Sequence, residues 1–202
     1  MRRTCSRGMF RFLCGVVRTI LRIFRPATRI EGVENIPDGA AVLCCNHSGM
    51  LDPLWVVAFS DLRILPRIMA KKELFRNKIL SWLFYKLGAF PVDRQGADIA
   101  AIKIAFQTLK DDNKLLIFPE GTRIRNGKRS QAHSGAALIA SRMHAPIVPI
   151  YLSPKRHFFS PVHLIVGKAY CLEFGGAKPT SQELQDSADE LMRRIYEMGD
   201  GK

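Results

Sequence analysis

The chain has 202 residues, of which 47% are hydrophobic and 24% charged, the proportions of an ordinary globular protein. This length predicts one domain with a short appendage and excludes an intrinsically disordered chain. The formal net charge is +13, and residues 1–30 hold eight arginines and no acidic residue. Because a nucleic-acid-binding domain usually spreads its basic residues over the fold, this segregation disfavours nucleic acid as a partner.

The cysteines and the apolar runs exclude further classes. Five cysteines are present, two of them adjacent at Cys44 and Cys45, and no C-x-x-C spacing occurs. This pattern indicates neither a disulfide framework nor a metal site, so we expect a reducing compartment and no bound metal. No run reaches the roughly 18 apolar residues that a membrane-spanning helix needs.

Residues 1–29 are predicted to form a basic amphipathic helix that lies in the plane of a membrane surface. On a helical wheel six arginines fall within roughly 60° of one another, opposite a broad apolar face. They are Arg7, Arg11, Arg18, Arg22, Arg25 and Arg29. Such a stripe favours anionic lipid headgroups, although a terminal helix packed on the core with a solvated charged face would also fit. Pro26 should end or kink this helix.

Residues 30–202 are predicted to form the main domain, in which strands and helices alternate. We expect strands or β-leaning runs at 40–45, 63–70, 89–92, 114–118, 147–152 and 162–174, and helices at 73–87, 97–110, 134–143 and 181–198. This alternation predicts an α/β fold with a largely parallel or mixed sheet flanked by helices.

The first candidate for chemistry directly follows the strand at 40–45, where open α/β sheets gather their ligands. The run Asn46-His47-Ser48-Gly49-Met50-Leu51-Asp52-Pro53 places a carboxylate five residues after an imidazole. A turn into a helix would bring Asp52 back to His47, which could then act as a general base oriented by the acid. Alternatively, His47 stabilises the turn and Asp52 is only a helix N-cap before a proline.

Two arginines lie beyond other predicted strands. Arg94 ends the run Gly88-Ala89-Phe90-Pro91-Val92-Asp93-Arg94, and Arg123 ends Phe118-Pro119-Glu120-Gly121-Thr122-Arg123. A guanidinium group can bind a phosphate through two parallel hydrogen bonds. Each arginine alone would more readily be read as a surface ion-pair former. Together, at strand ends beside His47 and Asp52, they favour an anionic substrate.

These blocks, in this order, resemble the glycerolipid acyltransferase family. The family signature His-x-x-x-x-Asp is similar to N-H-S-G-M-L-D-P, and the blocks G-A-F-P-V-D-R and F-P-E-G-T-R follow. The strand Ile147-Val148-Pro149-Ile150 stands in the place of a fourth block, and the run Met69-Ala70-Lys71-Lys72-Glu73-Leu74-Phe75 also resembles the family. The resemblance covers about residues 30–170.

The resemblance implies transfer of an acyl chain from an acyl thioester to the free hydroxyl of 1-acylglycerol-3-phosphate, giving phosphatidic acid. It implies that His47 is the catalytic base and that Asp52 orients it. The implied substrate-binding residues are Arg94, Glu120, Gly121, Thr122 and Arg123, with Pro149 on the acyl-donor side. Acyl-CoA or acyl carrier protein would bring the acyl group, and no further cofactor is expected.

One departure and several alternatives follow from the same comparison. His133 stands where relatives often carry a lysine shortly before the glycine of a small-residue helix. The substrate could therefore differ, although a tolerated surface substitution is the interpretation we favour. Another lyso-lipid acceptor, or a catalytically silent membrane-binding module, remains open. The expected partners are a membrane surface with anionic lipids, a lysophospholipid and the acyl donor. The expected location is the cytoplasmic face of a membrane, peripheral or monotopic.

Overall fold

The computed structural model describes residues 7–59, 66–93, 98–121, 132–154, 161–176 and 178–200. The first half of these contains α1 (Arg7–Phe24), β1 (Arg29–Glu31), the 3₁₀ turn η1 (Val33–Asn35), β2 (Ala41–Cys45), α2 (Asp52–Phe59), β3 (Arg67–Lys71), the 3₁₀ turn η2 (Lys72–Phe75), α3 (Lys78–Lys86) and β4 (Ala89–Val92). The second half contains α4 (Ile99–Lys110), β5 (Lys114–Ile117), α5 (Gly135–Met143), β6 (Ile147–Leu152), β7 (His163–Val166) and α6 (Ser181–Glu197). This order confirms the expected alternation of strands and helices.

The described strands form one mixed sheet in the order β1-β7-β6-β2-β5-β3-β4. The strands β2 to β6 pair in parallel with one another, whereas β7 runs antiparallel to β6. The carboxyl ends of these five parallel strands therefore meet at one edge of the sheet, which we call the carboxyl edge. The predicted α/β fold with a mixed sheet flanked by helices is confirmed.

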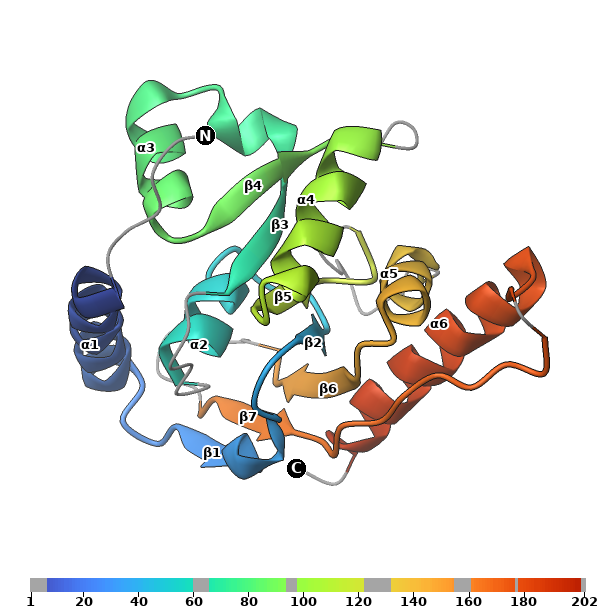
Figure 1. Ribbon diagram of the computed structural model, residues 1–202. Helices are drawn as coiled ribbons and strands as arrows, with labels where there is room; N and C mark the ends of the chain where they lie inside the picture. The colour runs from blue at the N-terminus through green and yellow to red at the C-terminus, as the bar shows by residue number, and fades with distance from the viewer. Residues whose placement is uncertain are drawn as a thin grey trace.

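Helices cover both faces of the sheet (Figure 1). Alternate side chains of β2 point to opposite faces. Leu43 packs in the cluster that holds the buried side chains of α1 and α2, and Val42 packs in the cluster that holds those of α4, α5 and α6. Phe75 of η2 and Phe84 of α3 pack against the first cluster. Because both faces are covered, every residue of β2 is buried, which explains its continuous apolar run.

The helix α1 packs on α2. Phe10 and Leu21 are 2% and 9% exposed, and both lie in the hydrophobic core. Arg18 donates two hydrogen bonds to the carbonyl of Ala58 in the last turn of α2, at 2.8 and 2.5 Å. The guanidinium of Arg18 thus satisfies a carbonyl at the negative end of the α2 dipole. This arginine of the stripe therefore binds the protein itself.

The side of α1 opposite Arg18 is exposed and apolar. Its exposed side chains are Met9, Phe12, Val16, Ile20, Ile23 and Phe24. The helix ends at Phe24, two residues before Pro26, as the proline predicts. The predicted helix over 1–29 is therefore too long, because Arg25 and Arg29 of the stripe lie beyond α1 and Arg29 begins β1. Among the residues that the structure describes, no helix is both long and apolar enough to cross a membrane.

Several local expectations are corrected. The predicted helix at 73–87 is two elements, because the side chain of Asn77 caps the N–H groups of Ile79 and Leu80 and starts α3 there. The β run at 162–174 is a strand only over His163–Val166. The strand β1 lies in a segment for which the sequence predicts no strand. Only three residues long, it depends on pairing with β7 and has no periodic signal of its own.

Candidate active site

His47 and Asp52 meet at the carboxyl edge. The chain leaves β2 at Cys45 and enters α2 at Asp52, and the turn between them brings Nδ1 of His47 to 3.1 Å from Oδ2 of Asp52. The same oxygen accepts the N–H groups of Ser48 at 2.7 Å and Gly49 at 2.6 Å. Asp52 is fully buried, so its charge acts on the imidazole with little screening by water.

This arrangement fixes the roles of the two imidazole nitrogens. A carboxylate oxygen that already receives two N–H groups is an acceptor, so Nδ1 of His47 carries a proton and donates to Asp52. Nε2 is then the basic nitrogen. A base oriented in this way can take a proton from a hydroxyl group, and Asp52 stabilises the imidazolium that results.

The backbone of His47 is held by Glu120, which lies in the loop after β5. The carboxylate oxygen Oε2 accepts the N–H of His47 at 3.0 Å, and Oε1 accepts the hydroxyl of Tyr196 on α6. Glu120 is only 1% exposed, and its burial raises the pKa of the carboxyl above its ordinary value. These contacts let Glu120 hold the backbone of His47 in place.

Two residues that the sequence analysis missed complete this support. Tyr196 lies near the end of a helix that showed only an ordinary amphipathic pattern, so nothing in the sequence links it to His47. Asn46 directly precedes His47 and exchanges two hydrogen bonds with the backbone of Leu152, at 2.9 and 2.8 Å. Its amide side chain fixes the end of β2 beside the end of β6, and a buried asparagine at a strand end is the signal that could have indicated this role.

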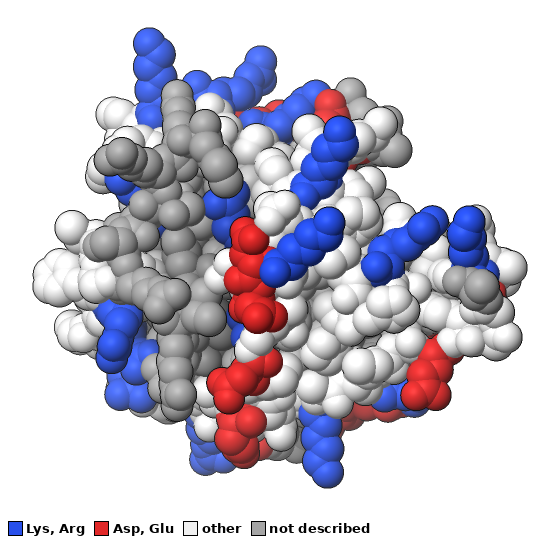
Figure 2. Space-filling view, viewed as in Figure 1, with Lys and Arg blue, Asp and Glu red and all other residues white. Residues whose placement is uncertain are grey.

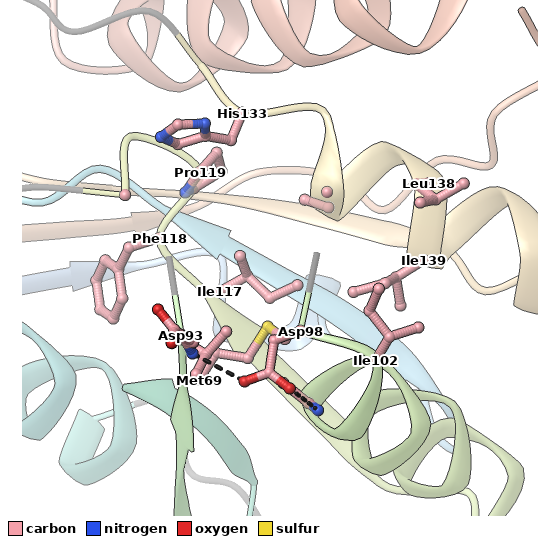
Figure 3. Close-up of a pocket in the computed structure, with 15 residues that line it drawn as sticks. Met69, Asp93, Asp98, Ile102, Ile117, Phe118, Pro119, His133, Leu138 and Ile139 are labelled. Atoms are coloured by element: carbon pink, nitrogen blue, oxygen red, sulfur yellow. Dashed lines mark hydrogen bonds between the residues drawn. The ribbon is translucent and has the colours of Figure 1, made fainter. Parts of the chain in front are cut away.

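Phe118 lines a pocket on the α4–α5 side of the carboxyl edge (Figure 3). Its ring centroid lies 4.5 Å from that of His47. The pocket has a volume of about 250 Å³, and most of its lining is apolar, including Met69, Ile117 and Ile139. Asp93 and Asp98 lie at its polar side, where Asp98 accepts the N–H of Asp93 at 2.8 Å. The pocket can hold an apolar group close to the base.

Gly121 and His133 lie together at the rim of this pocket. Gly121 has φ +64° in the turn after Phe118, and a Cβ atom there would lie 2.6 Å from the imidazole of His133. The N–H of His133 donates to the carbonyl of Pro119 at 2.8 Å, which holds the start of α5 against this turn. His133 therefore packs on the predicted substrate loop at Gly121. A lysine in place of His133 would lie against the same turn.

The remaining predicted site residues lie outside the described part of the chain. They are Arg94, Thr122 and Arg123. Asp93, the neighbour of Arg94, lies at the carboxyl edge and forms an ion pair with Lys72. Pro149 is buried within β6, and its carbonyl accepts the N–H of Gly167 at 2.8 Å. Within the described residues, no three His, Cys, Asp or Glu side chains converge as metal ligands.

The sequence matches the family described as Acyltransferase over residues 27–153, a span that contains the His47–Asp52 pair and both strand-end loops. The chain belongs to the acyltransferase family. Its membership confirms the resemblance on which the sequence analysis depended, and it makes the protein an O-acyltransferase.

Two curated relatives of this acyltransferase carry the same name. This chain is 32% identical over 199 residues to the 1-acyl-sn-glycerol-3-phosphate acyltransferase of Bacillus subtilis (strain 168), covering 94% of this chain and 96% of that one. It is 34% identical over 153 residues to the protein of the same name from Streptococcus pneumoniae, covering 74% of this chain and 56% of that one.

A solved structure supports the fold. The crystal structure of the 1-acyl-sn-glycerophosphate (LPA) acyltransferase PlsC from Thermotoga maritima aligns with a TM-score of 0.71 at 22% identity, covering 100% of this acyltransferase and 85% of that chain. At this identity the similarity shows a shared architecture alone.

Proposed function

We propose that this acyltransferase moves an acyl chain from an acyl thioester to the free hydroxyl of 1-acylglycerol-3-phosphate and so forms phosphatidic acid. The observation that carries the proposal is the contact between His47 and Asp52 at the carboxyl edge, which leaves Nε2 as a base. The names of the two curated relatives support the choice of acceptor. Family membership also favours an enzyme over a silent membrane-binding module.

The reaction needs one base and accurate positioning. An alcohol is a weak nucleophile, whereas a thioester is already an activated acyl group. Nε2 of His47 takes the hydroxyl proton while the oxygen attacks the thioester carbonyl. The tetrahedral intermediate collapses, the C–S bond breaks, and the proton passes from the imidazolium to the leaving thiolate. This scheme needs no cofactor besides the acyl donor, which is acyl-CoA or acyl carrier protein.

The acceptor phosphate would be bound by Arg94 and Arg123, with Gly121 and Thr122 shaping the acceptor pocket and Glu120 holding the backbone of His47 beside it. A phosphate monoester accepts two parallel hydrogen bonds from a planar guanidinium, which a lysine cannot reproduce. The pocket beyond Phe118 lies close enough to His47 to hold the apolar part of a lipid substrate.

Kinetics with two acceptors test the phosphate claim. Arg94→Ala should lower kcat/KM for lysophosphatidate by roughly 10–150-fold, and Arg94→Lys should recover only part of the loss. The loss for monoacylglycerol should be much smaller. Equal losses for both acceptors would assign Arg94 to the fold or to the donor. Mass spectrometry of products from a panel of lyso-lipids decides whether another lyso-lipid is the true acceptor, and labelled acyl-CoA and acyl carrier protein identify the donor.

Membrane docking by α1 belongs to the same proposal. Its exposed apolar side would enter the interface of an anionic membrane at the cytoplasmic face, with the enzyme bound peripherally. Because Phe10 and Leu21 belong to the core, deletion of the segment would disturb the fold, and point variants are the better test. Phe12→Ser with Ile23→Ser should lower sedimentation with anionic vesicles. Unchanged sedimentation of a folded variant would exclude docking by this side of α1.

A further inference from the structure

We propose that α3, with the basic residues around it, forms a second lipid-contacting surface, which enters the headgroup layer of an anionic membrane beside the carboxyl edge. This proposal goes beyond docking by α1. It depends on side chains that no part of the proposed reaction uses.

The outer side of α3 is apolar and exposed. Ile79, Trp82 and Leu83 are 79%, 60% and 38% exposed. They lie three and four positions apart, so they share one side of the helix. On the inner side Ser81 is buried, and Phe84 packs edge-on against Phe75 of η2 with ring centroids 5.8 Å apart. The helix is therefore anchored by one side and presents a contiguous apolar patch with the other, and such patches mark interaction sites.

Basic side chains surround this patch. The segment 71–88 carries Lys71, Lys72, Arg76, Lys78 and Lys86. Its one acidic residue is Glu73, whose carboxylate lies 3.5 Å from the ammonium of Lys71. Figure 2 shows Lys and Arg side chains projecting from the end of the molecule where Figure 1 places α3. Anionic lipid headgroups attract basic side chains that lie near a membrane surface.

Trp82 has the surroundings of an interfacial tryptophan. Its ring is exposed, and the ammonium of Lys86 lies 6.0 Å from the ring centroid. Tryptophan prefers the headgroup level of a membrane, where its ring contacts apolar chains while its N–H and a nearby cation meet polar groups. A lysine beside the ring can reach a lipid phosphate while its stem covers apolar surface.

The charge pattern selects a lipid surface over a second copy of this chain. Two copies that met through α3 would bring Arg76, Lys78 and Lys86 against each other without an acidic residue on α3, whereas Lys71 and Lys72 already pair with Glu73 and Asp93. The whole chain is also strongly basic, at +13. Like charges at close range oppose such a dimer, whereas anionic headgroups neutralise them.

The position of this surface suits a lipid substrate. The turn η2 follows β3 directly at the carboxyl edge, and Lys72 pairs there with Asp93 at the end of β4. The helices α1 and α3 both lie on the face of the sheet that carries the cluster of Phe10, Phe75 and Phe84. Docking through α3 would bring the membrane to the side of the molecule where His47 lies, which shortens the path of a lipid acceptor to the base.

Fluorescence of the whole protein tests the proposal directly. The chain has two tryptophans, and Trp55 is buried at 1% exposure, so Trp82 reports on the exposed side of α3. Vesicles of phosphatidylcholine and phosphatidylglycerol with brominated acyl chains should quench the emission and shift it to the blue. The Trp82→Phe variant should lose both effects while it still sediments with the vesicles. A protein that sediments with these vesicles without quenching or shift overturns the proposal.

Matched variants measure the contribution to binding. Ile79→Ser with Trp82→Ser should weaken binding to the anionic vesicles by roughly tenfold or more. Ile99→Ser removes an isoleucine of similar exposure (65%) from α4 on the other face of the sheet, and it should change nothing. Turnover of a monomeric short-chain acceptor should stay at the parent level in both variants. The vesicle-binding measurement needs no acceptor, so its outcome does not depend on the proposed function. Equal binding by both variants, or a parent dimer that the α3 variant dissociates, overturns the proposal.

Discussion

The carboxylate of Glu120 accepts the backbone N–H of His47 at 3.0 Å, which joins two residues 73 positions apart in the sequence. The other oxygen of the same carboxylate accepts the hydroxyl of Tyr196 on the last helix. His47 is thus held at two points, its ring by Asp52 and its main chain by a carboxylate that α6 orients.

The first prediction concerns the catalytic pair. His47→Ala should lower turnover by roughly 10²–10⁴-fold, because general-base assistance is lost. Asp52→Asn should also be severe, since the amide oxygen can still accept from Ser48 and Gly49 but cannot stabilise an imidazolium by charge. Steady-state kinetics measure both. Vesicle sedimentation should not change, and turnover of His47→Ala close to that of the parent would remove this residue from the mechanism.

The second prediction concerns Tyr196. Tyr196→Phe deletes the hydroxyl that orients Glu120, and kcat should fall by roughly five- to tenfold with little change in KM. Tyr170→Phe is the matched control, because the buried hydroxyl of Tyr170 has no hydrogen-bond partner within the described structure. If the two variants lose equally, or if only KM changes, Tyr196 does not position the base.

The third prediction follows from the burial of Glu120, which raises the pKa of its carboxyl. The folded state then binds this proton more tightly than the unfolded state does. Its contribution to stability is complete below the ordinary glutamate pKa and is lost as the pH rises through the raised value. Glu120→Gln, which stays neutral, should flatten this decline in denaturant titrations over a pH series.

A glutamate whose pKa is shifted in the opposite direction provides the control for that pH series. Hydrogen bonds from Thr180 lower the pKa of Glu183 in the capping box of α6. Its contribution is present above the ordinary pKa and is lost as the pH falls, so Glu183→Gln should remove stability at neutral pH. Parallel profiles of the two glutamine variants would contradict the assignment of Glu120.

The fourth prediction concerns Gly121, whose φ of +64° favours glycine. Gly121→Ala should cost about 1–2 kcal/mol of stability. The additional variant His133→Ala should not restore it, because the imidazole can rotate away from a new Cβ whereas the backbone strain remains. In the His133→Ala background, Asn should be tolerated better than Ala at position 121. Full rescue by His133→Ala in denaturant unfolding would instead attribute the loss to the contact with the imidazole.

The fifth prediction separates two arginines of α1. Arg18→Ala should lower the free energy of unfolding by about 1–3 kcal/mol, because the carbonyl of Ala58 loses a charged donor. Arg11, exposed on the same helix, should be close to neutral when replaced by Ala. Equal effects of the two substitutions in chemical denaturation would show that the contact with α2 contributes nothing.

The sequence by itself determined the main elements and the contact between His47 and Asp52, which we propose as the catalytic pair. Buried parallel strands such as 147–152 need continuous apolar runs, so their periodicity is visible without tertiary information. His47 and Asp52 lie five residues apart, and a local turn is enough to join them. Motifs of this kind depend on short-range geometry, which is why residue order carries them.

Only the tertiary structure decided which side chains support that pair. Tyr196, Glu120 and His47 are brought together by the packing of α6 and by the pairing of β2 with β5, interactions with no short-range signal. The arginine stripe of α1 gave no indication that Arg18 would bind α2 rather than lipid. A helical wheel shows which residues share a side of a helix, but the partner of that side is set by the fold.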